Sequence, residues 1–106
     1  MKAIEKLIGK KIIVRSDRAG VFYGTLNEVE PCGDKLTVEM VNVRRLWYWE
    51  GAATLTQLAM EGVTVPDKCK FTMWQDSVVV SGVIELLPTT QKAQDIIESV
   101  EVWKRL

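Results

Sequence analysis

A chain of 106 residues has room for one domain with a modest hydrophobic core. Hydrophobic residues make up 47% of it and charged residues 26%, as in folded globular proteins, which excludes a disordered tail. The 14 basic and 14 acidic residues cancel, which disfavours a general nucleic-acid binder. The chain has no histidine, and so lacks the imidazole of Ser-His-Asp, Cys-His and most catalytic zinc sites. We therefore expect a binding protein and not an enzyme, without cofactor or metal.

The N-terminal segment and the cysteines indicate the compartment. Residues 1–7 lack the long apolar stretch of a signal peptide, and no apolar run approaches the length of a membrane span. Cys32 and Cys69 would pair only in an oxidising compartment, and without histidine they cannot complete a zinc site in one chain. We expect a cytoplasmic protein with two free thiols and no membrane partner.

The first half of the chain has the pattern of antiparallel strands. Residues 11–15 predict a strand and 16–20 a turn that ends in a glycine. The returning strand, 21–29, contains Gly24, which predicts a sharp bend or a close approach of two backbones. Apolar and polar residues then alternate over 35–40, which predicts a half-buried third strand and a three-strand meander.

The second half adds two helices and completes the sheet. Thr54 begins the spacing of a capping box, followed by a helical stripe that Gly62 ends. Residues 76–87 are β-branched and apolar and are broken at 81–82, which predicts two short strands or one strongly bent strand. After Pro88, a threonine can cap a last helix with apolar residues at helical spacing.

These elements predict a mainly β fold of the α+β class. The order of the strands is similar to a small SH3-like or Sm-like β-barrel with an inserted short helix and a C-terminal helix. We expect a single domain over residues 1–106, with barrel strands about 11–49 and 69–87, the inserted helix about 54–61 and the C-terminal helix about 90–100. Exposed edge strands in such a barrel favour a homo-oligomer.

The most unusual segment is Arg44-Arg45-Leu46-Trp47-Tyr48-Trp49-Glu50-Gly51-Ala52-Ala53, which joins two guanidinium groups to three aromatic rings. The planar fork of arginine matches phosphate oxygens, and stacking on an aromatic ring contributes about 1–3 kcal/mol per base. Small residues allow the backbone to approach a ligand, and the amides of the following helix favour an anion. The expected ligand-binding residues here are Arg44, Arg45, Trp47, Tyr48, Trp49, Gly51 and Ala52.

A purely structural role is the alternative for part of this segment. On a strand, Trp47 and Trp49 face one side and Tyr48 the other, so one set is expected to be core. The two arginines can equally be solvated or paired with nearby glutamates at little energetic gain. Binding is favoured for Arg45 and not for Arg44.

A second candidate is the turn over residues 16–20. Asp17 is suited to accept a hydrogen bond from a ribose hydroxyl, and Arg18 to contact phosphate. The alternative, that Asp17 caps the turn through its own backbone, is somewhat favoured. Trp74 and Trp103 are assigned to the core or to a subunit contact, because an isolated tryptophan more often packs than binds.

Several motifs in this order resemble a family of small uncharacterised phage and prophage proteins: Arg15-Ser16-Asp17-Arg18-Ala19-Gly20-Val21-Phe22, Arg45-Leu46-Trp47-Tyr48-Trp49-Glu50-Gly51-Ala52-Ala53, Gln57-Leu58-Ala59, Gly62-Val63 and Cys69-Lys70-Phe71-Thr72. The resemblance covers most of the chain. It implies the cytoplasm of a phage-infected bacterium as the setting. Small oligomeric phage proteins include sponges that sequester nucleotide signals of defence systems such as Thoeris and CBASS. By analogy with them, and from the chemistry of the arginine and aromatic cluster, we expect anti-defence sequestration here.

Four hypotheses follow for function. The first is a phage protein that sequesters a nucleotide-derived immune signal, such as a cyclic ADP-ribose derivative, without chemistry, in a pocket between subunits. The second is a single-stranded nucleic-acid-binding module, which the neutral charge disfavours. The third is a module that binds a host protein through its tryptophans. The least favoured is a metal-dependent phosphodiesterase.

Overall fold

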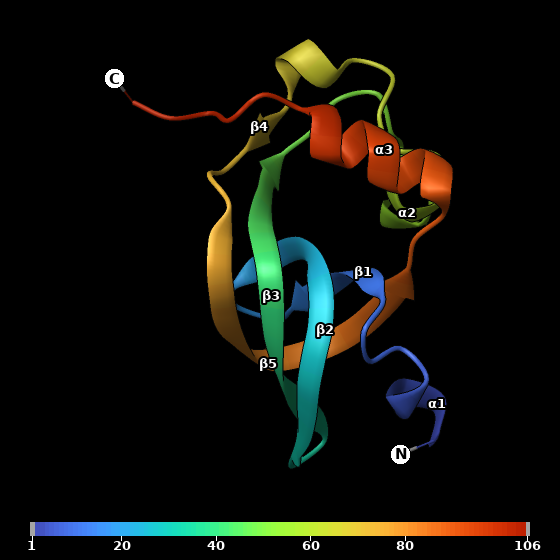
Figure 1. The fold of residues 1–106 in the computed structure, drawn as a ribbon, viewed down its shortest axis with the longest axis vertical. Coiled ribbons are helices and arrows are strands. Elements are labelled where there is room, and N and C mark those ends of the chain that lie inside the picture. Colours follow the sequence, from blue (N-terminus) through green and yellow to red (C-terminus); the bar gives the residue numbers. More distant parts are fainter. Residues whose placement is uncertain (1, 106) are drawn as a thin grey trace.

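The computed structural model describes residues 2–105, and Figure 1 shows a ring of strands with two helices packed at one end. Just under half of these residues lie in strands, three of which are long and curved, and the helices are short. In chain order the elements are α1 (Lys2–Glu5), β1 (Lys11–Ser16), β2 (Gly20–Cys32), β3 (Lys35–Tyr48), α2 (Leu55–Glu61), the 3-10 turn η1 (Pro66–Lys68), β4 (Lys70–Phe71), β5 (Gln75–Pro88) and α3 (Gln91–Ser99).

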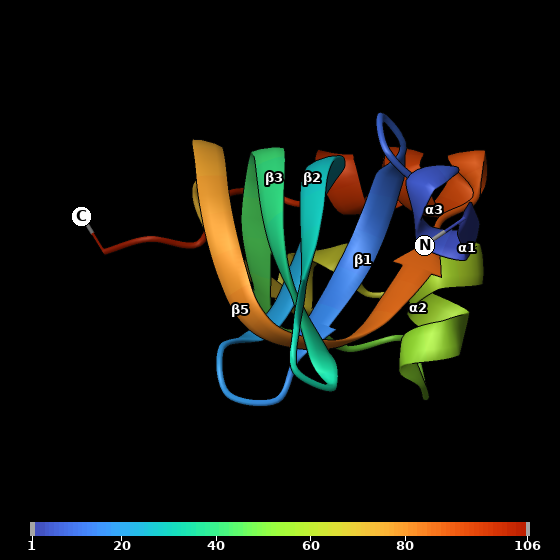
Figure 2. The same cartoon turned by 90° about the horizontal axis from the view of Figure 1, so that it is seen from below.

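The sheet is antiparallel throughout. Its strand order is β2-β1-β5-β3-β4, and β2 also pairs with β3, so four strands form a barrel-like ring to which β4 adds a short edge. Figure 2 shows the curvature of β5 around this ring. The expected mainly β class with short helices is confirmed. Of the two alternatives for residues 76–87, the structure has one bent strand and not two short ones, since β5 runs through Gly82, whose φ is +64°.

The capping residues in the sequence predicted the positions of α2 and α3 correctly. The side chain of Thr54 accepts a hydrogen bond from the amide of Gln57 at 3.0 Å, and α2 begins at the next residue. Thr90 caps α3 in the same way through the amide of Ala93, at 3.1 Å. Such caps satisfy amides that have no partner inside the helix. The first helix, α1, was not predicted.

Two apolar clusters hold the ring and the helices together. One fills the ring, and the other lies where α2 and α3 cover its end. The fully buried side chains of the covered end come from every part of the chain: Ile13, Tyr23, Leu46, Leu58, Phe71, Ala93 and Ile97. Each such side chain contributes about 1.5–3 kcal/mol relative to exposure. The packing therefore fixes α3 and β4 against β3, where the candidate site is built.

A β-bulge interrupts the pairing of β2 with β3 near this end. Tyr23 pairs with Arg44 and Thr25 with Val41, so Gly24 faces two residues of β3, and β3 bulges there. A Cβ on Gly24 would lie 2.9 Å from the Cα of Val43, which confirms the expected close approach of backbones.

None of the helices within residues 2–105 is long and apolar enough to cross a membrane.

Candidate functional site

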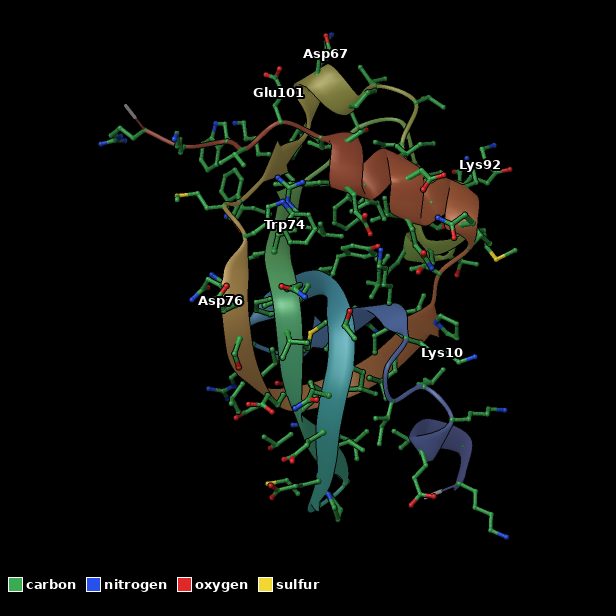
Figure 3. The ribbon with its side chains drawn as sticks, in the orientation of Figure 1. Lys10, Asp67, Trp74, Asp76, Lys92 and Glu101 are labelled. Carbon is green, nitrogen blue, oxygen red and sulfur yellow. The ribbon has the colours of Figure 1, made fainter. Side chains whose placement is uncertain are left out.

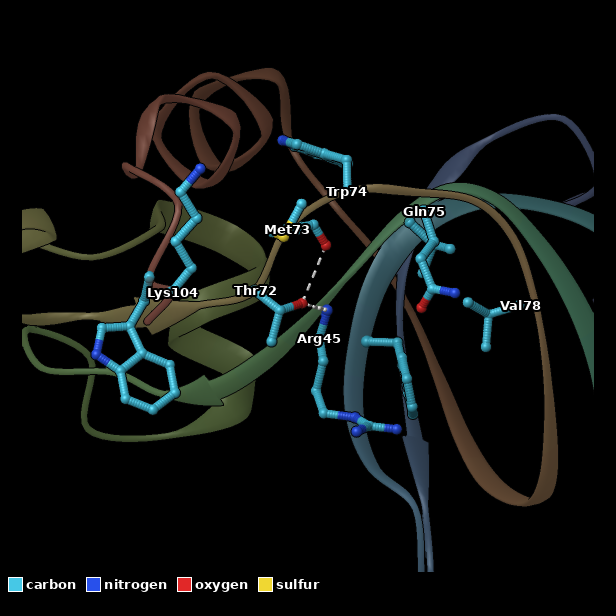
Figure 4. A pocket seen from close by; sticks show the side chains of 10 residues that line it. Arg45, Thr72, Met73, Trp74, Gln75, Val78 and Lys104 are labelled. Atoms are coloured by element: carbon cyan, nitrogen blue, oxygen red, sulfur yellow. Dashed lines mark hydrogen bonds between the residues drawn. The ribbon is translucent and has the colours of Figure 1, made fainter. Parts of the chain in front are cut away.

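A cavity of about 430 Å³ opens beside Arg45, and we call it the Arg45 cavity. Its walls come from β2, β3 and β5, from the segment that joins β4 to β5, and from the tail that follows α3. Figure 4 shows Lys104 on one side, Gln75 and Val78 on the other, and Arg45 and Thr72 between them. The lining residues are Phe22, Val43, Arg45, Thr72, Met73, Trp74, Gln75, Val78, Trp103 and Lys104.

The backbone of Arg45 is held in place by a hydrogen bond, and its charged side chain is left available to a ligand. Its amide donates to the hydroxyl of Thr72 at 2.9 Å, and that hydroxyl donates to the carbonyl of Met73 at 3.2 Å (Figure 4). The guanidinium carbon lies 4.7 Å from the ring centre of Phe22. Within residues 2–105 no carboxylate forms an ion pair with Arg45 or Lys104. The cavity therefore presents two uncompensated cations, which favour an anionic ligand.

Arg44, expected among the ligand-binding residues, is instead a structural residue. Its side chain is 1% exposed, and Nη1 donates to the carbonyls of Ile97 and Val100 at 3.1 and 2.9 Å. Nε and Nη2 donate to the carbonyls of Thr72 and Phe71. Burial lowers the pKa of Arg44. The guanidinium thus satisfies carbonyls at the C-terminal end of α3, where the helix dipole favours a cation, and joins that helix to β4.

The three aromatic residues at the end of β3 have two different roles. Trp49 is half-buried and packs on the core, whereas Trp47 is 58% exposed. The two tryptophans share a face of an ideal strand, but β3 ends at Tyr48, so the alternation stops between them. The hydroxyl of Tyr48 donates to Glu50 at 2.8 Å, and this hydrogen bond, with burial, raises the pKa of Tyr48.

Trp47 forms an aromatic platform with the C-terminal tail. Its ring stacks on Trp103 with centroids 5.3 Å apart and planes 8° apart. The ammonium of Lys70 lies 5.3–5.6 Å from the rings of Trp47, Tyr48 and Trp103. The tail is held by a hydrogen bond from the amide of Trp103 to the carbonyl of Phe71, at 2.9 Å. This platform places a second group of rings and a third cation beside the Arg45 cavity.

Sequence reasoning missed Trp74, Trp103 and Lys104. Of the two roles expected for the tryptophans, the core is wrong, because both line the cavity and are 40% and 48% exposed, whereas a subunit contact stays a prediction. Trp74 is held in place by the guanidinium of Arg44, 4.8 Å from its ring centre. The adjacent aromatic and basic residues at 103–104, beyond the end of the helix, were the signal available. Their meeting with Arg45 depends on long-range packing.

The other predicted site residues lie away from the cavity. Asp17 forms an ion pair with Lys35 at 2.6 Å, and this hydrogen bond lowers the pKa of Asp17 although desolvation opposes it. Arg18 is exposed in the same turn, and neither residue lines the Arg45 cavity. Ala52 is half-buried and packs against the apolar cluster of the covered end.

Gly51 has a structural reason to be glycine. Its φ is +92°, and a Cβ there would lie 2.4 Å from the amide nitrogen of Thr64. That amide donates to the carbonyl of Gly51 at 3.2 Å, so the space beside the glycine holds the chain itself and no ligand. The loop after β3 therefore packs directly against the loop after α2.

Acidic and sulfur-containing residues do not suggest a metal centre. Within residues 2–105, no three histidine, cysteine, aspartate or glutamate side chains are grouped so that they could hold a metal ion. Cys69 is buried, and burial raises the pKa of its thiol, which makes it a poor nucleophile.

Comparison with known proteins assigns most of this chain to one family. Residues 9–97 match the family model described as a domain of unknown function, DUF6948. The chain belongs to the DUF6948 family. The part that matches DUF6948 contains Arg45, Trp47 and Trp74, whereas Trp103 and Lys104 lie after it. No curated protein and no solved structure gives a significant match to the chain.

Proposed function

We propose that this member of the DUF6948 family is a non-catalytic binding protein whose Arg45 cavity takes a nucleotide-class ligand. The observation that carries the proposal is one cavity that contains two exposed indoles and a guanidinium with no ion-pair partner among residues 2–105. Phosphate oxygens match the fork of Arg45, and a purine ring matches the face of Trp74 or Trp103.

The size and lining of the cavity support binding without chemistry. A volume of about 430 Å³ lies within the roughly 300–1,000 Å³ range of small-molecule sites. Its described lining residues include no carboxylate and no thiol, so they supply none of the usual general bases except an amine, Lys104. A ligand held there is therefore expected to be released unchanged.

The finer part of the proposal is biological. We infer that the ligand is a nucleotide-derived bacterial immune signal and that the protein, in an SH3-like fold, sequesters it during phage infection. The resemblance of the motifs to phage and prophage proteins supports this setting, and a sponge requires only binding.

The same proposal includes a homo-oligomer. Met73, Trp74 and Trp103 leave much of the cavity wall exposed, with Met73 at 57%. Contiguous exposed apolar surface marks an interaction site in many proteins, and a second copy covering it would enclose the ligand. Light scattering after size exclusion, with and without the captured ligand, tests this part: a monomer in both states contradicts it.

The experiment uses ligand capture. The purified protein is mixed with cyclic and linear adenine nucleotides, including ADP-ribose isomers and cyclic dinucleotides, separated from free ligand and heated, and the released compounds are analysed by mass spectrometry. We expect one compound to be depleted and then recovered intact. Depletion with recovery of a modified product contradicts the non-catalytic role.

Matched variants locate the site. Arg45→Gln and Trp103→Ala each remove one proposed contact and are expected to weaken capture at least about tenfold. Arg15→Gln is the control, because Arg15 pairs with Glu85 at 2.9 Å on another surface. Unchanged capture in both cavity variants would reject the Arg45 cavity as the site.

A second candidate function is single-stranded nucleic-acid binding. The observation that favours it is the platform of Trp47, Trp103 and Lys70, which extends beyond the cavity and suits consecutive bases. This function is favoured if an oligonucleotide binds more tightly than any mononucleotide in the same capture assay.

A further inference from the structure

The first half of β5 has a free edge. Residues 75–80 pair with β3 on one side, whereas β1 pairs with β5 only from Val83 onward. Within residues 2–105, no other strand pairs with residues 75–80. Figures 1 and 2 show this half of β5 at the margin of the ring, and Figure 3 places Asp76 on that margin. The edge therefore presents backbone amides and carbonyls that a further strand can bind.

The free edge of β5 lacks the features that usually keep exposed edges from pairing. Residues 75–80 contain no proline and no lysine, and their one charged residue is Asp76. Three consecutive valines, which favour pleated structure, end this stretch. Val79 is 64% exposed, the highest value among the large apolar side chains of residues 2–105. A flat, β-branched edge of this kind is suited to pair with another strand.

A second free edge, on β2, is protected. Residues 28–32 pair with β3, and β1 pairs with β2 only over residues 20–25. Pro31 has no amide hydrogen to donate, and Glu28 and Glu30 are exposed carboxylates on this stretch. If β5 of one copy paired with this edge of the next, these carboxylates would lie near Asp76. The contrast between the two edges favours pairing of β5 with β5.

The length of the free edge limits how two copies can pair. The amide of Asp17 donates to the carbonyl of Gly82 at 2.9 Å, and the hydroxyl of Ser16 donates to the carbonyl of Ser81 at 2.8 Å. These contacts occupy β5 where β1 begins to pair with it. At its other end the strand begins at Gln75. An antiparallel partner must therefore be centred between these two limits.

From this edge we propose that two copies of the chain pair through β5, antiparallel, around a two-fold axis at Val78. Ser77 then lies opposite Val79 of the second copy on the outer face of the sheet, and Asp76 lies opposite Val80 and away from the second Asp76. Like charges placed directly opposite each other would be destabilising, so this register suits the sequence. The two-fold operation uses both free edges at once and closes the assembly as a dimer.

The surface next to this edge indicates a second copy as the occupant. Met73 and Trp74 come directly before the edge and are exposed, and the proposed function already has a second copy covering them. Gln75 and Val78 belong to the edge and also line the Arg45 cavity. The strand of the second copy would therefore lie beside the cavity. The inference rests on the homo-oligomer of the proposed function, and it adds the surface, the symmetry and the register.

The experiment is light scattering after size exclusion on two matched variants. Ser77→Lys/Val79→Lys places a lysine opposite a lysine at two points of the pairing, and we expect it to be a monomer where the wild type is a dimer. Ser77→Lys/Val79→Glu places each lysine opposite a glutamate of the second copy and should remain a dimer. Both positions are exposed, so both variants should fold, and circular dichroism and Tm check this.

The outcomes separate this inference from the proposed function. A wild-type protein that is a monomer with and without captured ligand overturns the inference and the homo-oligomer, while nucleotide capture stands or falls by its own assay. If the wild type and the double-lysine variant are both dimers, the β5 interface alone is overturned. If the lysine–glutamate variant dissociates as the double-lysine variant does, the pairing of Ser77 with Val79 is wrong. A dimer that only the double-lysine variant loses supports the interface even if no nucleotide is captured.

Discussion

Arg44 and Arg45 are neighbours on β3 with opposite surroundings. Arg44 lies on the face of Leu46, which is buried, and Arg45 on the face of Trp47, which is exposed. Strand alternation alone therefore separates the two, once Leu46 is assigned to the core. What the sequence does not reveal is the set of carbonyls that makes burial of Arg44 tolerable, because they come from residues 27 to 56 positions away.

Replacement of Arg44 tests its structural role. Arg44→Leu leaves the carbonyls of Ile97 and Val100 without their donor, and we expect the free energy of unfolding to fall by roughly 3 kcal/mol. Urea denaturation measures the change. Arg15→Leu breaks only an exposed ion pair and should cost less than about 1 kcal/mol. Equal losses in the two variants would contradict the structural role.

Glu98 gives a prediction on acid stability. Partial burial tends to raise its pKa, but hydrogen bonds from Lys11 and Tyr23 outweigh this and hold the pKa below its ordinary value. A group whose pKa is lower in the folded state stabilises the protein above the unfolded-state pKa, and this stabilisation is lost as the pH falls through the folded-state pKa.

We expect Glu98→Gln to lower stability at pH 7 and to reduce the loss of stability between about pH 5 and pH 3. Urea titrations of both proteins across this range provide the measurement. A variant as acid-sensitive as the wild type would show that the pKa of Glu98 does not differ between the folded and unfolded states.

At the level of elements, local signals were sufficient for the helices and insufficient for the site. Thr54 and Thr90 predict the starts of α2 and α3 because the capping hydroxyl and the amide that it accepts from are only three residues apart. The Arg45 cavity joins β3, the segment before β5 and the tail, which meet only through tertiary packing. Arg45 itself could therefore be predicted from the sequence, but the other residues that line the cavity could not.

The loop after β3 provides a test at this scale. In Gly51→Ala the new methyl group meets the backbone of Thr64 and Val65 and the φ is unfavourable, so we expect a loss of at least about 2 kcal/mol in the free energy of unfolding. Gly33→Ala is the matched comparison, because its φ of +65° is also positive but its Cβ would point into open space. Its expected cost is about 1 kcal/mol. Similar Tm values for the two variants would contradict the packing of the two loops.

For the whole molecule, a net charge of zero conceals a local excess of cations. Arg45, Lys70 and Lys104 lie around one aromatic surface, although the chain as a whole has equal numbers of acidic and basic residues. The composition indicated a folded protein and disfavoured a general polyanion binder, and the strand pattern indicated a mainly β fold, but neither could reveal a patch assembled from distant segments.

Salt dependence distinguishes the two candidate functions at this scale. A nucleotide held by Arg45 and Lys104 should show a slope of about −1 to −2 in log K against log salt concentration, because few counterions are released. Calorimetry or fluorescence titration between 50 and 300 mM salt, on the order of physiological strength, measures it. A markedly steeper slope would indicate an extended strand that tracks many phosphates.

The positions of the two free thiols have a practical consequence. Cys32 is exposed at the tip of the β2–β3 hairpin, whereas Cys69 is buried at the opposite end, near the tail (Figure 1). A maleimide at neutral pH should therefore attach to one atom of the folded protein, far from the Arg45 cavity. The native chain can thus be tethered to a sensor surface in a single orientation with its aromatic end facing the solution, and no engineered tag is needed.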